Sequence, residues 1–569
     1  AQQVTARPPA VVSLHGRLDD NAAALLAAYR ASAAELEAGR GLVPAAEWLL
    51  DNYHLVEAQI REIRDDLPPG YYRQLPKLAA SAFAGYPRVF GLAWAFVAHT
   101  DSHFDPAVLR RFIAAYQKVQ PLTIGELWAV AITLRIVLIE NLRRLSDQIT
   151  AARLARADAQ ALANRLLAAG NARMALEADM ATRAAGPLSE IFAAQLAKRL
   201  RDQDPRTTPA LGWLEDRLRL QGSSIGEVVE HAHQRQGASN VTVRNVITSV
   251  RLISSIDWAE LVESVSLVDE RLRAGSAFGE MDFPTRNLYR SAIEQLARGS
   301  GACELEIARL ALQACGAGAA ADEGTGQEAR AADPGYHLIA EGRPALERAA
   351  GFRPPLRLTL TRLARGLGMA GYVGTILALA LLLLACALWA LQGAGAGLLA
   401  VLALAALVPA TEVATALVNR AIAWGFVSTA LPGLALRGGV PAALRTLVVV
   451  PTLLTSDAEL LEQIERLEVH HLSGAGGDIA FALLADGADA VSEASAADAA
   501  LLALAGDAVE RLNQRHGPGP GGGPRFFLLH RRRLFNPAEN RWMGWERKRG
   551  KLHELNRLLR GATDTSFVP

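Results

Sequence analysis

Apolar positions in the first 350 residues recur at the spacing of amphipathic helices. The segment AAEWLLDNYHLVEAQIREI, residues 45–63, is followed by the helix-ending pair Pro68 and Pro69. A second segment, residues 122–149, has Thr123 and Glu126 at capping-box spacing. We therefore predict a helical region over residues 1–315. We expect the segment 45–63 to form a single helix with six apolar side chains on one stripe: Trp48, Leu49, Tyr53, Val56, Ile60 and Ile63.

The pattern is lost in residues 316–335, GAGAAADEGTGQEARAADPG, which predict a linker because they lack periodicity. We assign residues 316–365 to this linker and the approach to a membrane. No charged residue occurs from 366 to 411, a length that suffices for two crossings of about 20 residues each. We predict a transmembrane hairpin over residues 366–420, with spans at 372–391 and 397–418 joined by QGAGAG. A buried hairpin in a soluble protein is the alternative.

Basic residues flank this hairpin on both outer sides, whereas its connector has none. By the positive-inside rule, both large flanking segments are expected to be cytoplasmic. Glu412, near the end of the second span, has two interpretations: a functional carboxylate within the membrane, or a side chain at the interface. The flanking basic residues are Arg353, Arg357, Arg362, Arg365, Arg420, Arg437 and Arg445.

The pattern changes after residue 440. Short apolar runs at 445–456, 478–490 and 525–533 alternate with helical segments at 458–472 and 497–513. This alternation predicts a parallel α/β domain over residues 440–569, in which ligands bind beyond the carboxyl ends of the strands. Thr452, Asp486 and the run HRRR, residues 530–533, fall at such ends. Asp486 is suited to accept a hydrogen bond from a uracil imide or a ribose hydroxyl, although ADGADA also fits a simple turn.

A basic cluster, WERKRGKLHELNRLLRG, occupies residues 545–561. We expect a helix over residues 551–560 with Gly550 at its start, where free N–H groups and the helix dipole favour a diphosphate. Arg547, Lys548, Arg549 and Lys551 add charge-assisted donors. A solvated basic face or a contact with anionic lipid remains the alternative interpretation.

Composition limits the other functions that need to be considered. Lys and Arg number 59 against 58 Asp and Glu, so we expect no nucleic-acid partner. Three cysteines, one of them within an apolar run, do not form a disulfide framework. The histidines of HAH, residues 231–233, and HH, residues 470–471, lack further ligands at metal spacing, which favours ordinary surface histidines. The first residues lack an apolar signal-peptide core, and a cytosolic first region is expected.

Several ordered blocks of the chain resemble bacterial cyclic β-1,2-glucan synthases. They include WLLDNYHLVEAQIREIRDDLPPGYYRQLP, LTIGELWAVAITLRIVLIENLRRL, RTLVVVPTLL, FALLADGADA and FFLLHRRRLFNPAENRWMGWERKRGKLHELNRLLRGATDTSF. The resemblance implies an inner-membrane, multi-pass enzyme with a GT-A type, Rossmann-like glycosyltransferase domain. It implies inverting transfer from UDP-glucose to a growing β-1,2-glucan carried on the enzyme.

The resemblance also implies roles for individual residues. Pro451 and Thr452 would border the uridine, and Asp486 would contact its base or ribose, with Asp489 as a secondary candidate. The diphosphate would lie beside a basic loop and helix formed by Arg549, Gly550, Lys551 and Asn556.

The chain departs from that family at the chemical centre. GT-A enzymes hold Mg²⁺ or Mn²⁺ with an Asp-x-Asp after a later strand and use an acidic general base. Neither is found after Arg445, so we expect no catalytic residue and no metal ligand in this chain. We expect an incomplete glycosyltransferase domain with an unpaired sheet edge, in a fragment of the synthase that is inactive alone. The alternatives are a non-catalytic membrane scaffold with a degenerate nucleotide-sugar fold, and a module that binds a lipid surface.

Overall fold

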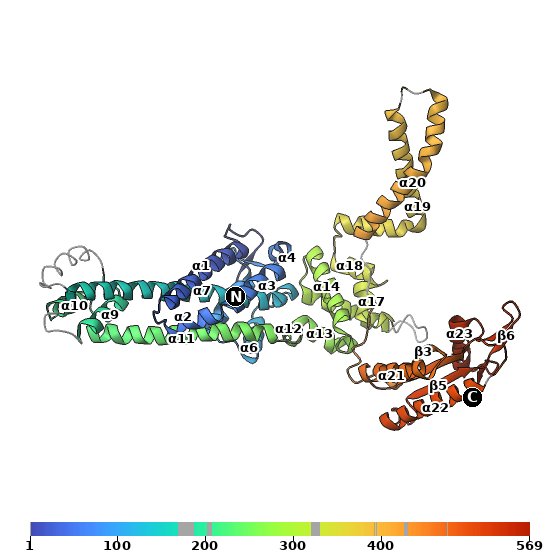
Figure 1. Ribbon diagram of the computed structural model, residues 1–569. Helices are drawn as coiled ribbons and strands as arrows, with labels where there is room; N and C mark the ends of the chain where they lie inside the picture. The colour runs from blue at the N-terminus through green and yellow to red at the C-terminus, as the bar shows by residue number, and fades with distance from the viewer. Residues whose placement is uncertain are drawn as a thin grey trace. The chain divides into compact units, whose positions relative to one another are not determined.

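The computed structural model describes residues 2–168, 187–201, 208–319, 330–391, 393, 395–425, 431–474, 476–494 and 496–568. The chain divides into two compact units. The first, which we call the helical unit, comprises Ala1–Ser276 and Tyr289–Leu363. The second, the α/β unit, comprises Ala277–Leu288 and Ala364–Pro569. Figure 1 shows that helices make up most of the chain, as predicted.

Helices form nearly all of the helical unit, with one antiparallel pair of two-residue strands, β1 (Val4–Thr5) and β2 (Lys77–Leu78). Part of the predicted linker, residues 320–329, lies outside the described residues. The helices are α1 (Leu14–Glu37), α2 (Pro44–Asp51), α3 (Tyr53–Asp66), α4 (Pro69–Gln74), α5 (Arg88–His99), α6 (Pro106–Gln117), α7 (Ile124–Ala168), α9 (Glu190–Arg201), α10 (Thr208–Leu220), α11 (Ile225–Ser255), α12 (Trp258–Val265), α13 (Leu267–Gly275), α14 (Phe283–Ser300), α15 (Glu304–Ala319), α17 (Pro334–Ile339) and α18 (Arg343–Ala350).

Helix α7 is the centre of this unit and packs against α1, α3, α5, α9 and α11. The predicted capping box is present at its start. Thr123 Oγ1 accepts from the Glu126 backbone N–H at 3.2 Å, and Glu126 Oε2 accepts from the Thr123 N–H at 2.9 Å. Buried Arg88 pairs with the same carboxylate, which fixes α5 against the start of α7. The helix continues well beyond the predicted end at residue 149.

The stripe predicted for residues 45–63 packs against the core, where Trp48 and Tyr53 are partly buried and its other members are buried. The prediction of a single helix is wrong. The helix is interrupted at Asn52, which lies between α2 and α3. Asn52 Nδ2 donates to the Trp48 carbonyl at 2.9 Å, and its backbone has φ −112° and ψ 15°. Asparagine competes in this way with helical hydrogen bonding, because its short side chain reaches nearby backbone groups.

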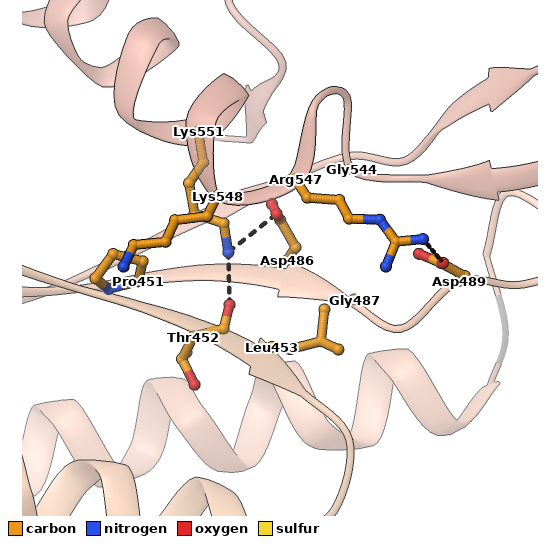
Figure 2. A pocket seen from close by; sticks show the side chains of 10 residues that line it. All are labelled: Pro451, Thr452, Leu453, Asp486, Gly487, Asp489, Gly544, Arg547, Lys548 and Lys551. Atoms are coloured by element: carbon orange, nitrogen blue, oxygen red, sulfur yellow. Dashed lines mark hydrogen bonds and ion pairs between the residues drawn. The ribbon is translucent and has the colours of Figure 1, made fainter. Parts of the chain in front are cut away.

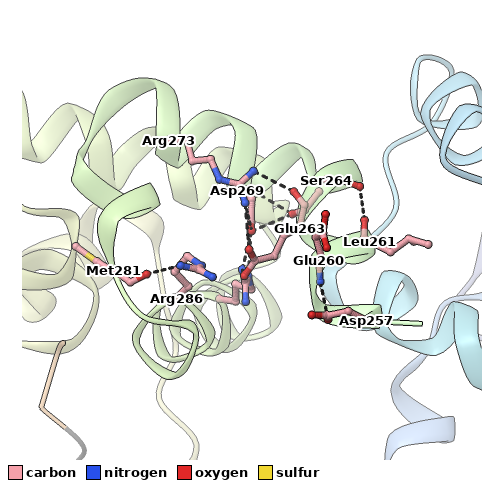
Figure 3. Close-up of polar contacts among 11 residues, drawn as sticks. Asp257, Glu260, Leu261, Glu263, Ser264, Asp269, Arg273, Met281 and Arg286 are labelled. Atoms are coloured by element: carbon pink, nitrogen blue, oxygen red, sulfur yellow. Dashed lines mark hydrogen bonds and ion pairs between the residues drawn. The ribbon is translucent and has the colours of Figure 1, made fainter. Parts of the chain in front are cut away.

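A buried charge network holds together the helices after α11. Arg290 donates to Glu263 at 2.5 Å and to Asp269 at 2.7 Å. Arg273, on α13, contacts the same two carboxylates (Figure 3). Such a network tolerates the loss of a partner poorly, because the remaining charges stay buried.

Two long apolar helices form the hairpin, α19 (Leu356–Ala390) and α20 (Ala396–Gly425), and both are long and apolar enough to cross a membrane. Tyr372 Oη donates to Asn419 Oδ1 at 2.9 Å and links them. Helix α19 begins before the predicted span and has a kink at Gly368, where φ is 54°. Residues 392 and 394 of the predicted connector lie outside the described residues.

The segment after the hairpin forms the predicted parallel sheet. Strands β3 (Thr446–Leu454), β4 (Ile479–Gly487) and β5 (Phe526–Arg531) are parallel, and β8 (Phe567–Val568) is antiparallel to β5, in the order β3-β4-β5-β8. Helices α21 (Asp457–Ser473) and α22 (Ala496–His516) pack on it around Leu467, Phe481 and Phe526. A hairpin of β6 (Leu534–Asn536) and β7 (Arg541–Met543) leads to α23 (Arg547–Leu559).

No strand pairs with the outer edge of β3 within the described residues, whereas the outer edge of β5 is covered in part, because β8 pairs with it at His530 and Arg531. The apolar sequence of β3 is only half-buried along most of its length, in contrast to β4. The predicted unpaired edge is therefore that of β3.

Candidate functional site

A cavity of about 330 Å³ lies at the carboxyl ends of β3 and β4, against the start of α23 (Figure 2). This is the edge of a parallel sheet at which ligands usually bind. Basic side chains come from α23 and acidic ones from β4 and the turn that follows. The lining residues are Pro451, Thr452, Leu453, Asp486, Gly487, Asp489, Gly544, Arg547, Lys548 and Lys551.

Asp486 is the buried carboxylate of the cavity. Its two oxygens accept from Nε and Nη2 of Arg531, each at 2.8 Å, and Oδ2 lies 3.0 Å from Lys551 Nζ. Arg531 also contacts Glu554 at 3.3 Å. Two carboxylates and two cations thus balance one another in a buried cluster, which is the condition under which buried charges are tolerated.

Lys551 connects α23 to the sheet. Its Nζ donates to the Thr452 carbonyl at 2.7 Å (Figure 2). It also donates to the Leu484 carbonyl at 3.4 Å. Burial lowers the pKa of Lys551, and the Asp486 carboxylate opposes that shift. Lys551 is therefore a buried support of the cavity wall, and its charge is already used by Asp486.

The mouth of the cavity carries two more accessible cations. Arg547 pairs with Asp489 at 2.9 Å, and its side chain remains 65% exposed. Figure 2 shows Lys548 extending over Pro451. In the part of the chain that the structure describes, no carboxylate pairs with Lys548. Lys548 is therefore free to meet a bound anion, whereas Arg547 would meet one while it also lies beside Asp489 and Glu539.

The predicted start of the last helix is wrong. Helix α23 begins at Arg547 and not at residue 551, so Gly550 lies inside its first turns. A Cβ on Gly550 would lie 1.9 Å from the Trp545 carbonyl oxygen, so the close approach of the preceding turn requires glycine here. Gly487 and Gly544 are the glycines that line the cavity, and a Cβ on Gly544 would lie 2.7 Å from Asp486 Oδ2.

Some of the predicted site residues line the cavity, and others do not. Pro451, Thr452, Asp486 and Lys551 line it together with Asp489. Gly550 is buried within α23 and does not line the cavity. The Arg549 side chain is 84% exposed and pairs with Glu546 at 3.0 Å, and Asn556 donates to the Leu552 carbonyl within its own helix at 3.0 Å. Neither Arg549 nor Asn556 lines the cavity.

Three residues that organise the cavity were not among the predicted site residues: Arg531, Gly544 and Glu554. A signal for Arg531 existed, because it lies in the run HRRR at the end of the predicted strand run 525–533 and so reaches the same edge of the sheet as Asp486. No pattern in the sequence distinguished Gly544 from Gly550.

The carboxylates of the cavity do not fit a divalent cation. Asp486 is held by Arg531 and Lys551, and Asp489 by Arg547, so each already neighbours a positive charge. Among the described residues, no group of three or more His, Cys, Asp or Glu side chains is arranged to hold a metal ion. The lining instead favours an anionic ligand at the mouth and a hydrogen-bond donor near Asp486.

The chain is similar in sequence to a known enzyme. No family model matches it. It is 40% identical over 556 residues to the cyclic beta-(1,2)-glucan synthase NdvB of Rhizobium meliloti (strain 1021), a match that covers 96% of this chain and 19% of that protein. The chain is therefore related to the cyclic β-1,2-glucan synthases and spans about a fifth of the length of the synthase that it matches.

Proposed function

We propose that the α/β unit holds half of the donor site of a membrane-bound glucosyltransferase, which uses UDP-glucose to build cyclic β-1,2-glucan. The observation that carries this proposal is the cavity at the ends of β3 and β4, where Asp486 and the cations Arg547 and Lys548 face one space. The relationship to a glucan synthase supports the choice of a sugar nucleotide among anionic ligands.

The cavity offers complementary groups to the two parts of a nucleoside diphosphate. A carboxylate has about four acceptor positions, and three donors already reach Asp486. One position remains for a uracil imide or a ribose hydroxyl. The first turn of α23 has N–H groups without helical partners, and Lys548 and Arg547 add charge beside them, which favours the diphosphate.

The complete synthase is expected to supply Mg²⁺ or Mn²⁺, its acidic ligands and a general base from the part of its length that this chain does not span, since the cavity described above does not fit a metal. On this view the chain alone binds donor but does not transfer glucose.

The hairpin of α19 and α20 supports location in a bacterial inner membrane, with both large flanking segments on the cytoplasmic side where sugar nucleotides occur. The partners proposed are UDP-glucose, the growing glucan, the lipid bilayer and the remainder of the synthase. A concave site favours a small anion over the flat lipid surface considered as an alternative. The scaffold alternative predicts no specific nucleotide binding.

The test is calorimetric titration of the purified full chain in detergent with UDP, UDP-glucose and ADP. We expect UDP to bind more tightly than ADP, and Lys548→Ala to weaken UDP binding at least tenfold. Arg549→Ala is the matched control, because Arg549 is a neighbouring cation outside the cavity. Equal weakening by both variants, or no difference between UDP and ADP, would overturn the proposal.

A further inference from the structure

The helical unit has its own cavity, larger than that of the α/β unit, with a volume of about 760 Å³. Its walls come from α1, the segment between α1 and α2, and helices α7, α9 and α11. This volume lies in the range of small-molecule sites, about 300–1,000 Å³. The feature is unrelated to the donor site, because all of its residues belong to the other unit.

Positive charge collects in this cavity from separate segments of the chain. Among the lining residues the structure describes, one is acidic, Glu35. Glu35 pairs with Arg40 and with Arg153, at 2.9 Å for the latter. The hydrogen bond from Arg40 is the largest cause that lowers the pKa of Glu35. The basic lining residues are Arg40, Arg153, Arg156, Lys198 and Arg201.

Three of these cations lack a counter-ion among the residues that the structure describes. Within the described residues, no carboxylate pairs with Arg156, Lys198 or Arg201. Arg156 is half-buried, and its Nη2 donates only to the neutral amide of Gln236, at 3.0 Å. Burial lowers the pKa of Arg156, as expected when a cation loses water without gaining a negative partner. An anion in the cavity would supply the missing charge.

The remaining wall limits the kind of anion. Amide groups of Gln160 and Gln195 lie 3.5 Å apart and provide donors and acceptors. The described lining residues include no Phe, Tyr or Trp, and the imidazole of His233 is the one aromatic ring among them, so a nucleobase or a sugar ring finds little stacking surface. Small apolar side chains complete the wall: Ala28, Ala31, Ala157, Ala194, Val229 and Ala232.

We propose that this cavity in the helical unit binds a small, soluble, phosphorylated anion, with Arg156 and Lys198 as its principal contacts. Phosphate oxygens match guanidinium and ammonium donors, and a multiply charged anion gains from cations presented by several helices at once. The proposal gives the helical unit a ligand of its own and does not depend on donor binding.

The test uses inorganic pyrophosphate as the probe, titrated into the purified full chain by calorimetry. We expect Arg156→Gln with Lys198→Gln to weaken its binding at least tenfold. The control Arg244→Gln, an exposed cation on α11 outside the cavity, should leave binding unchanged. Because pyrophosphate also suits the donor site, each titration is repeated in Lys548→Ala. Binding that persists there and disappears with the Arg156 and Lys198 changes supports the proposal.

Two further measurements decide the remaining outcomes. Arg156→Gln should not lower the thermal unfolding midpoint in phosphate-free buffer, because it removes an uncompensated charge, and Arg156→Lys should retain most of the binding. Dihexanoyl phosphatidic acid tests a lipid source of the phosphate, and binding tighter than that of pyrophosphate would overturn the soluble ligand. The site would be overturned if the double variant Arg156→Gln with Lys198→Gln bound pyrophosphate as Arg244→Gln does. Complete loss of pyrophosphate binding in Lys548→Ala alone would also overturn it.

Discussion

Arg531 and Asp486 form a bidentate ion pair inside the α/β unit, with both N–O distances at 2.8 Å and the Arg531 side chain fully buried. The pair joins the carboxyl ends of β4 and β5, and Lys551 and Glu554 complete it. The orientation of Asp486 toward the cavity therefore depends on an arginine from the neighbouring strand.

Replacing Arg531 with Met is expected to lower the free energy of unfolding by about 3–5 kcal/mol, because Asp486 and Glu554 would remain buried with one cation between them. Thermal unfolding and hydrogen exchange of β4 and β5 measure the effect. The adjacent exposed residue provides the control, and Arg532→Met should change stability by no more than about 0.5 kcal/mol. Equal stability of the two variants would contradict a structural role for the ion pair.

Two glycines near α23 are expected to respond differently to substitution with alanine. Gly544→Ala places a methyl group against Asp486 and should weaken UDP binding by narrowing the cavity. Gly550→Ala should destabilise the fold by about 1–3 kcal/mol, since its Cβ would meet the Trp545 carbonyl oxygen.

Gly506, inside α22, is the control for these two variants because a Cβ there meets nothing within 4 Å. Gly506→Ala should stabilise the chain by about 0.5–1 kcal/mol through helix propensity alone. Chemical denaturation and UDP titration of the three variants separate the effects. Gly550→Ala as stable as Gly506→Ala would disprove the close approach at Gly550.

Glu304 is expected to make the stability of the helical unit depend on pH. Burial is the main cause that raises its pKa to about 7, while its hydrogen bond from the Ile124 N–H, at 2.7 Å, opposes the shift. Glu294 and Glu126 add to the increase and Arg298 opposes it. The folded state thus binds this proton more tightly than the unfolded state, whose pKa is near 4.5.

The stabilisation from this group is complete below pH 4.5 and is lost as pH rises through 7. The loss is expected to be about 3 kcal/mol. Unfolding at pH 5 and pH 8 measures it, and Glu304→Gln should remove most of the difference because glutamine still accepts from the Ile124 N–H. Glu306→Gln, at an exposed site beside Arg309, should leave the pH dependence unchanged. An undiminished dependence in Glu304→Gln would assign it to another group.

Periodicity and local chemistry predicted those parts of the fold that short segments determine. The capping box of Thr123 and Glu126, each helix of the apolar hairpin and each of the three parallel strands are encoded within a single short segment of the chain. The break at Asn52 was missed because apolar spacing continues across it, and the side-chain hydrogen bond from Asn52 to the Trp48 carbonyl does not alter that spacing.

The candidate site was predicted in part for a related reason. Strand ends identify Thr452 and Asp486, because topology alone brings them to one edge. The sequence does not say which cations are already paired, and so it did not separate Lys551, which supports Asp486, from Lys548, which is available. Arg549 has the same charge as its neighbours, but its position on α23 directs it away from the cavity.

The orientation of the hairpin can be tested with cysteines already in the chain. Cys303, in the helical unit, is exposed. Because basic residues flank the hairpin on both sides, a membrane-impermeant maleimide should label Cys303 in spheroplasts only after they are permeabilised. Gly393→Cys, between α19 and α20 in a chain whose native cysteines are replaced by alanine, should be labelled without permeabilisation. Labelling of Cys303 in sealed spheroplasts would reverse the orientation and remove the helical unit from the cytoplasm.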